Sequence, residues 1–211
     1  MIKENKKEVS KILNAYGYDE YSKIVYKKLL ERADKVFFKI GQGTARAAYD
    51  AGKFVLKVAL NRKGLEQNNQ EYNNHHIFWN EYNEIIAAIK FISSGNSFLI
   101  MEKANQITST QQFREVNGFG IDYLKFKLNE KDFDENLQFY YRDIDEPINK
   151  KAQKRLNKII DFVQSIDSTV HWGDITELTS WGIASRGGKK HAVLIDYGVN
   201  DEIIRKYYGG I

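Results

Sequence analysis

The spacing of apolar residues changes along the chain and divides it into three stretches. From residue 4 to residue 31 the apolar positions recur at helical spacing and predict a pair of helices that meet near Gly17. Between residues 36 and 102, β-branched and aromatic runs separated by turns predict short antiparallel strands around one Asn-rich helix. The predicted strands are Val36–Ile40, Ala47–Tyr49, Phe54–Leu60, Lys90–Ile92 and Ser97–Glu102, and the predicted helix is Gly64–Ile89. Its candidate core contacts are Tyr72, His76, Trp79, Ile85 and Ile89.

The third stretch, from Ile107 onwards, is mostly helical and ends in a hairpin. The predicted helices are Thr110–Val116, Ile121–Leu128, Glu135–Tyr141 and a long one that starts at Asp145 and Pro147 and reaches Ile166. The predicted hairpin consists of Trp181–Ala184, a basic turn at Arg186–Lys190 and the strand Ala192–Ile195. A β-rich first half followed by a helical second half indicates the α+β class.

Composition excludes several kinds of chemistry. The 211 residues include no Cys, which rules out a disulfide framework, a thiolate zinc site and a cysteine nucleophile. The charged start has no apolar centre like that of a secretory signal, and no apolar run is long enough for a membrane span, so we expect a cytoplasmic protein. The net charge of +4 comes from basic residues interleaved with acidic ones, which argues against nucleic-acid binding.

A glycine-rich turn is the first candidate site. Gly41 and Gly43 lie in the turn Gly41-Gln42-Gly43-Thr44-Ala45-Arg46 between two predicted strands. Glycines let backbone amides approach a phosphate closely and donate hydrogen bonds to its oxygens. Many ordinary hairpin turns also carry two glycines, so the turn by itself leaves both interpretations open.

A lone cation inside an apolar strand is the second candidate. Lys57 interrupts the run Phe54-Val55-Leu56-Lys57-Val58-Ala59. Taken by itself, such a lysine could simply point outwards to water.

Two carboxylates in the second half form the third candidate. Asp174 follows His171-Trp172-Gly173, and Asp196 starts Asp196-Tyr197-Gly198 after a predicted strand, 22 residues later. One carboxylate could orient a hydroxyl or accept its proton while the other holds Mg²⁺. Taken singly, each aspartate could also be a helix cap or a turn residue.

Taken together, these residues resemble the protein-kinase-like superfamily. The resemblance implies a bilobal α+β fold: a helical extension at 1–34, a β-rich nucleotide-binding lobe at 35–104 and a reduced helical lobe at 105–211. Lys57 matches the lysine that grips the nucleotide phosphates, and Glu71 in the following helix is the expected ion-pair partner, with Glu81 and Glu66 in reserve.

The same resemblance assigns the remaining site residues. Gly41, Gly43 and Arg46 would bind the phosphates of ATP, and Glu102 and Ala104 of the segment Ile100–Ala104 would contact adenine through their backbone. Asp174 matches the catalytic-loop aspartate, and Asp196 matches the Mg²⁺-binding aspartate. The implied cofactors are therefore ATP and Mg²⁺.

The sequence departs from the family pattern at several positions. Arg46 replaces the third glycine, so the turn could be stiffer or the guanidinium could contact phosphate. Gly173 before Asp174 is more similar to small-molecule kinases. Thr179 occupies the place of the second metal ligand, and Ser180 could replace it if the loop is one residue longer. The sequence ends 13 residues after Gly198, where the family continues with an activation segment and further helices.

Three functions are compatible with these residues. The first is a phosphotransferase that moves the γ-phosphate of ATP to a hydroxyl, with a protein Ser or Thr as the expected acceptor. The second is a catalytically inactive kinase-like module that binds a host protein, and the third is a small-molecule kinase. Small proteins of this kind occur in bacterial viruses, so the cytoplasm could be that of a host cell.

Other conspicuous residues have simpler interpretations. The adjacent pair His75-His76 points about 100° apart on a helix, which favours a surface pair over a metal site. Trp79, Trp172 and Trp181 indicate packing, and the basic turn at 186–190 indicates a solvated hairpin tip.

Overall fold

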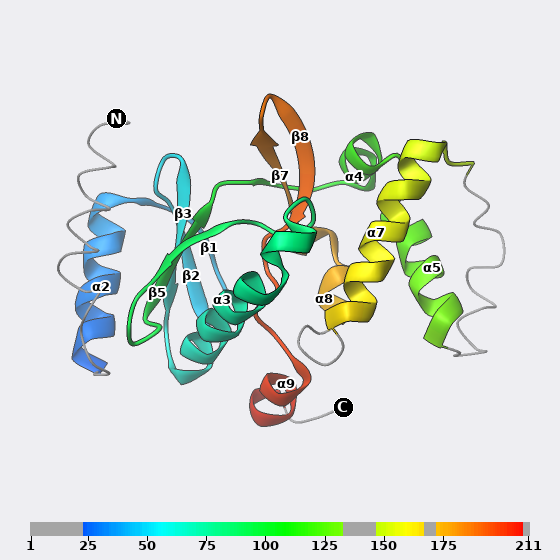
Figure 1. Ribbon diagram of the computed structural model, residues 1–211. Coiled ribbons are helices and arrows are strands. Elements are labelled where there is room, and N and C mark those ends of the chain that lie inside the picture. The colour runs from blue at the N-terminus through cyan, green and yellow to red at the C-terminus, as the bar shows by residue number, and fades with distance from the viewer. Residues whose placement is uncertain (1–22, 133–146, 167–171, 209–211) are drawn as a thin grey trace. The chain divides into compact units, whose positions relative to one another are not determined.

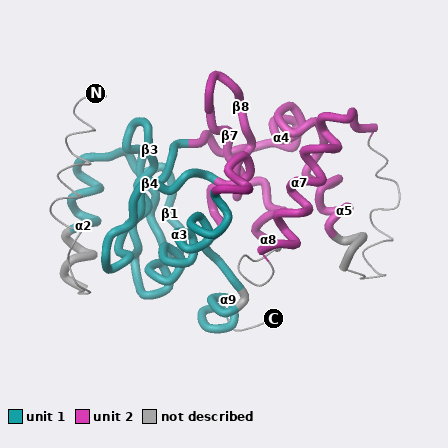
Figure 2. Tube along the Cα trace, viewed as in Figure 1, with its two compact units in different colours: residues 1–79, 87–103, 198–211 teal, residues 80–86, 104–197 magenta. Residues whose placement is uncertain are grey.

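The computed structural model describes residues 23–132, 147–166 and 172–208 (Figure 1). The chain forms two compact units (Figure 2): unit 1 takes the residues up to 79, 87–103 and those from 198 on, and unit 2 takes 80–86 and 104–197. The elements of unit 1 are α2 (Lys23–Val36), β1 (Phe38–Gln42), β2 (Arg46–Asp50), β3 (Phe54–Ala59), most of α3 (Arg62–Tyr82), β4 (Ile89–Ile92), β5 (Phe98–Glu102) and α9 (Asp201–Tyr207).

Unit 1 is built on a five-stranded antiparallel sheet in the order β1-β2-β3-β5-β4. Alternate residues of a strand point to opposite faces, so Leu56 and Val58 share one face while Lys57 lies on the other. Leu56 and Val58 pack in one core with Leu29 and Ala33 of α2. The face that holds Lys57 is the one from which its side chain reaches α3.

The buried face of α3 differs from the prediction. The helix ends at Tyr82, and Ile89, predicted to be its last residue, starts β4. Tyr72 and His76 were predicted to contact the core, but both are exposed. The buried positions instead include polar residues one helical turn apart: Gln67, Asn68, Glu71 and Asn74. The prediction was wrong for Tyr72 and His76, because the middle of this helix buries hydrogen-bonding groups, whereas Ile85 and Ile89 are buried as predicted.

Unit 2 combines helices with a small antiparallel sheet in the order β6-β7-β8. Its elements are the end of α3, β6 (Asn105–Gln106), α4 (Thr110–Asn117), α5 (Ile121–Asp132), α7 (Lys150–Ile166), α8 (Trp172–Ile175), the 3-10 helix η2 (Leu178–Ser180), β7 (Trp181–Arg186) and β8 (Lys189–Leu194). The long helix predicted from Asp145 begins at Lys150, because the Asn149 side chain caps it by accepting hydrogen bonds from the backbone N–H of Lys151 and Ala152. The helix predicted at 135–141 lies outside the described residues.

A half-buried arginine ties the elements of unit 2 together. Arg155 of α7 donates hydrogen bonds to the Ala192 carbonyl at 2.6 Å and to Asn117 Oδ1 at 3.1 Å. Burial lowers the pKa of Arg155 to about 10, and the charge of Glu84 opposes that shift.

The fold class is α+β, as the sequence predicted, with the antiparallel sheet in unit 1 and most helices in unit 2. Across 23–132, 147–166 and 172–208, every helix is too short or too polar to span a bilayer.

Candidate functional site

Lys57 lies in the interior of unit 1, paired with Glu71. Lys57 Nζ donates hydrogen bonds to Glu71 Oε1 at 2.8 Å and Oε2 at 3.1 Å. The lysine side chain is 10% exposed and the glutamate side chain is fully buried. The outward-pointing alternative is therefore wrong for Lys57, since residue parity on β3 directs the side chain to the α3 face.

Arg46 binds the same carboxylate. Its Nη1 donates to Glu71 Oε2 at 2.5 Å and to Asn68 Oδ1 at 3.4 Å. Arg46 lies opposite Ala59 in the β2–β3 ladder, two positions from the pair Ala48–Lys57, so both cations share one face of the sheet. One buried glutamate thus holds the end of the glycine-rich turn and the strand lysine together, and the side chain of Arg46 is engaged by the protein.

Glu66 and Glu81, the two alternative partners for Lys57, lie elsewhere on α3. Glu66 accepts hydrogen bonds from Lys206 Nζ at 2.7 Å and from the Tyr207 hydroxyl at 2.8 Å. Glu81 lies exposed in the last turn of α3. Glu71 is the glutamate that the structure places against Lys57.

The glycine-rich turn is docked on the start of α3. Asn61 Nδ2 donates to the Thr44 carbonyl at 2.8 Å, and the backbone N–H of Leu60 donates to the Ala45 carbonyl at 2.8 Å. A Cβ on Gly64 would lie 2.1 Å from the Ala45 carbonyl oxygen, so only glycine allows this approach.

Gly41 and Gly43 are not required by packing. A Cβ added to either glycine meets no atom within 4 Å, and neither glycine has a positive φ. The space above the turn is open, and the fold by itself does not demand glycine there. A ligand that approaches the backbone closely gives a reason for both residues.

The expected adenine-binding segment spans the end of β5. The backbone N–H of Glu102 donates to the Ala88 carbonyl at 2.8 Å, and its side chain accepts from the Ala88 N–H at 2.7 Å. Lys103 Nζ donates to Asp50 Oδ2 at 2.6 Å, which fixes this segment to the end of β2. Ala104 belongs to unit 2, where a Cβ on Gly182 would lie 2.9 Å from the Ala104 Cβ.

Asp174 lies in the short helix α8 of unit 2 and is half-buried. Trp181 stabilises this segment: its buried indole Nε1 donates to the Ile175 carbonyl at 2.7 Å. The Thr176 hydroxyl donates to the Gly173 carbonyl at 3.0 Å. The sequence indicated Trp181 only as a packing residue, because a hydrogen bond six residues back leaves no pattern.

Asp196 lies two residues after the end of β8 and is exposed. The N–H of the preceding residue, Ile195, donates to the Ser180 carbonyl at 2.8 Å, so the segments that carry Ser180 and Asp196 lie side by side. Ser180 itself is buried, whereas Thr179 is exposed and its carbonyl accepts from Gln106 at 2.9 Å.

The donor set fits Mg²⁺ held mainly by its nucleotide. Mg²⁺ in phosphotransferases takes one or two protein carboxylates and completes its coordination with phosphate and water oxygens. Asp196 supplies an exposed carboxylate of this kind, with hydroxyl residues on the adjoining segment. Within the described ranges, no cluster of three or more His, Asp or Glu side chains could hold a metal without such help.

Asn68 also belongs to the glutamate cluster, although no sequence motif indicated it. Its Nδ2 donates to the Asn96 carbonyl at 2.8 Å, and its Oδ1 accepts from Arg46. Asn68 lies three residues before Glu71, so a search for polar residues at helical spacing would have found it.

Comparisons with models of known families and with curated proteins find no match. Among solved structures, the streptomycin–ATP–APH(2'')-IIa ternary complex is 16% identical with a TM-score of 0.38, over 85% of this chain and 71% of that chain. The gentamicin–APH(2'')-IIa complex is 16% identical with a TM-score of 0.39, over 85% and 71%. The GDP and kanamycin complex of APH(2'')-IIia is 15% identical with a TM-score of 0.35, over 76% and 66%.

Proposed function

We propose that this protein is an ATP- and Mg²⁺-dependent phosphotransferase. The observation that carries the proposal is the buried pair of Lys57 and Glu71 on the sheet face next to the glycine-rich turn. Burying a lysine and a glutamate costs free energy, and apolar residues of similar size often stabilise a fold equally well. A functional requirement for a cation fixed in one position explains why this pair is kept.

The residues of unit 1 bind the nucleotide. Lys57, held in place by Glu71, contacts the phosphates with its ammonium group, and the backbone N–H groups around Gly41 and Gly43 donate to phosphate oxygens. The backbone of Glu102, together with that of Ala104 from unit 2, contacts the adenine. Phosphoryl transfer depends mostly on positioning and charge neutralisation, which such a set supplies.

The residues of unit 2 serve the acceptor and the metal. Asp174 accepts the proton of the acceptor hydroxyl, whose oxygen forms the new bond to the γ-phosphorus. The bond from the γ-phosphorus to the β–γ bridging oxygen breaks, and ADP leaves with that electron pair. Asp196 is the ligand for Mg²⁺, which when bound neutralises charge on the phosphates, and Ser180 and Thr179 are the neighbouring oxygen donors.

The acceptor class is the open part of the proposal. The sequence predicted a protein Ser or Thr, with a small hydroxyl compound as the alternative. Gly173 before Asp174 favours the small compound. Streptomycin, gentamicin and kanamycin are bound in the three solved structures, so these compounds are candidate acceptors for the assay.

The test measures the release of ADP from ATP with and without Mg²⁺. It is run without an acceptor, with each of these three aminoglycosides, and with casein as a Ser/Thr-containing acceptor. We expect Mg²⁺-dependent release that one acceptor class accelerates and that Asp174→Asn abolishes. No Mg²⁺-dependent release under any condition contradicts a phosphotransferase, and bound ATP without turnover would favour the non-catalytic module.

A further inference from the structure

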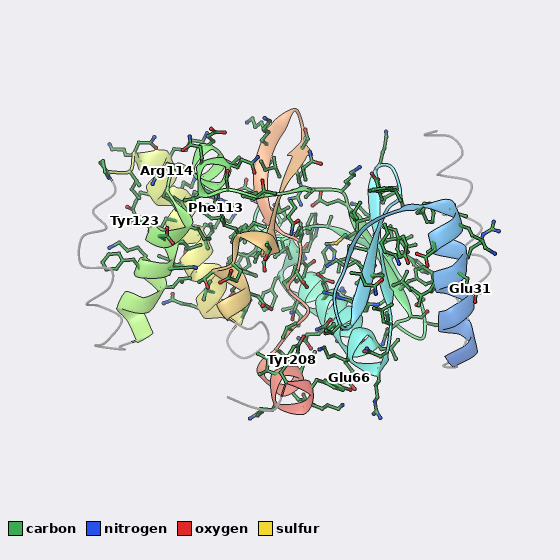
Figure 3. All side chains as sticks on the ribbon, turned by 180° about the vertical axis from the view of Figure 1, so that it is seen from behind. Glu31, Glu66, Phe113, Arg114, Tyr123 and Tyr208 are labelled. Atoms are coloured by element: carbon green, nitrogen blue, oxygen red, sulfur yellow. The ribbon has the colours of Figure 1, made fainter. Side chains whose placement is uncertain are left out.

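The chain after Gly198 returns to the helix that carries Glu71. Helix α9 packs beside the first turns of α3, and Figure 3 shows Glu66 of α3 near Tyr208, which follows α9. Glu66 Oε1 accepts from both Lys206 Nζ, at 2.7 Å, and the Tyr207 hydroxyl, at 2.8 Å. Two consecutive residues of α9 thus hold one carboxylate of α3.

A second contact joins the same end of α3 to the glycine-rich turn. Lys63 Nζ lies 3.7 Å from the ring centroid of Tyr208, a cation–π distance. The same ammonium donates to Thr44 Oγ1 at 3.0 Å. The C-terminal segment, the start of α3 and the turn are therefore connected through Lys63.

The backbone at the start of this segment lies directly on α3. A Cβ on Gly198 would be 2.5 Å from the Gln67 carbonyl oxygen and 3.2 Å from the Glu71 Cβ. Only glycine allows this contact. The last residue of the Asp196-Tyr197-Gly198 motif is therefore packed against the glutamate that holds Lys57.

The interface between α3 and α9 depends on polar contacts more than on apolar packing. A pocket of about 1050 Å³ lies along it, with Leu65, Glu66, Ile203 and Lys206 among its lining residues. Of the α9 residues whose exposure is described, only Ile203 is buried. The polar contacts of Lys206 and Tyr207 with Glu66 can be removed one at a time by substitution.

The pKa shifts of Glu66 and Lys206 favour the charged form of both groups and so support the ion pair between them. Burial raises the pKa of Glu66, but the hydrogen bonds from Lys206 and Tyr207 and the charges of Lys206 and Arg62 outweigh it and hold the pKa below its ordinary value. The hydrogen bond to Glu66 raises the pKa of Lys206. Both groups stay charged at neutral pH.

We propose that α9 is a clamp that positions Glu71, with Lys206 and Tyr207 as positioning residues; this inference rests on the proposed function. Glu66 and Glu71 are five residues apart on one rigid helix, about 7.5 Å along its axis, so whatever fixes Glu66 fixes Glu71. Around Glu71 the buried face of α3 consists of the polar residues Gln67, Asn68 and Asn74, whose positions depend on hydrogen bonds. The clamp sets that position and keeps Lys57 where the phosphates bind.

The test uses the full chain with Lys206→Met, with the conservative Lys206→Arg, and with Tyr207→Phe, which removes only the hydroxyl. The exposed Arg205→Met on the same helix is the matched control. Amide hydrogen exchange is measured over α3 at 62–79 and over α7 at 150–166, without nucleotide. We expect Lys206→Met to raise exchange over α3 about fivefold with α7 unchanged, Tyr207→Phe to raise it less, and Arg205→Met and Lys206→Arg to match the wild type.

A second readout is the rise of the melting temperature on addition of Mg²⁺ and ATP. We expect Lys206→Met to reduce this rise and Lys206→Arg to restore it. Unchanged exchange over α3 in Lys206→Met, or an equal increase in both helices, overturns the clamp. Because exchange is measured without nucleotide, it tests the clamp even if the wild type shows no response to ATP, an outcome that would count against the proposed function alone.

Discussion

Replacing Glu71 by glutamine is expected to lower the free energy of unfolding by about 3–5 kcal/mol and to weaken ATP binding. The substitution keeps the size of the side chain but removes the negative charge that Lys57 and Arg46 share at 2.8 Å and 2.5 Å. Two cations with side chains about one-tenth exposed would then face each other without this carboxylate. Urea unfolding with and without ATP measures both effects.

Glu81→Gln is the matched control for this experiment. It makes the same change in the same helix, at an exposed position with no ion pair found among the described residues. We expect its unfolding midpoint and its response to ATP to equal those of the wild type. Equal losses in Glu71→Gln and Glu81→Gln, or no loss in Glu71→Gln, would show that the buried glutamate does not hold the site together.

Replacing Asp196 by asparagine is expected to reduce Mg²⁺-dependent turnover by a factor on the order of 1000 with little change in stability. Asp196 is exposed after the last strand, so its neutral isostere leaves the core of unit 2 intact. An amide oxygen binds Mg²⁺ less strongly than a carboxylate and contributes no charge against the phosphates. Turnover as a function of Mg²⁺ concentration, together with a thermal melt, measures the two quantities.

Asp161→Asn on the exposed side of α7 serves as the control for Asp196. It changes the net charge of unit 2 equally and should leave turnover unaltered. Full turnover in Asp196→Asn would remove the metal-binding role from this residue. A similar loss in both variants would point to a general effect of charge.

The placement of Lys57 could be predicted from the sequence only through the motif resemblance, because the strand pattern alone also allowed it to point outwards to water. Leu56 and Val58 flank it on an apolar strand, so parity alone puts Lys57 on the face away from them. The motif resemblance then places its glutamate 14 residues later, at Glu71. The five strands were also predictable, since short local runs between turns determine them.

Other features depend on contacts that are distant in sequence or run against the usual apolar pattern. Arg46 at the third glycine position suggested two roles, and only the folded chain shows its guanidinium on Glu71, 25 residues away. The bond between Glu66 and Lys206 spans 140 residues and leaves no local signal. Tyr72 and His76 were misplaced because α3 buries amides and a carboxylate along its middle, in addition to apolar residues nearer its two ends.

The central claim is that Lys57, held by Glu71, forms part of a nucleotide phosphate site. Calorimetric titration of Mg²⁺ and ATP into the wild type and into Lys57→Met tests it most directly. We expect saturable binding to the wild type and affinity about ten- to a hundredfold weaker in Lys57→Met, the effect of one lost charge-assisted hydrogen bond. Absence of binding to the wild type at millimolar ATP, or equal affinity in both proteins, would contradict the account.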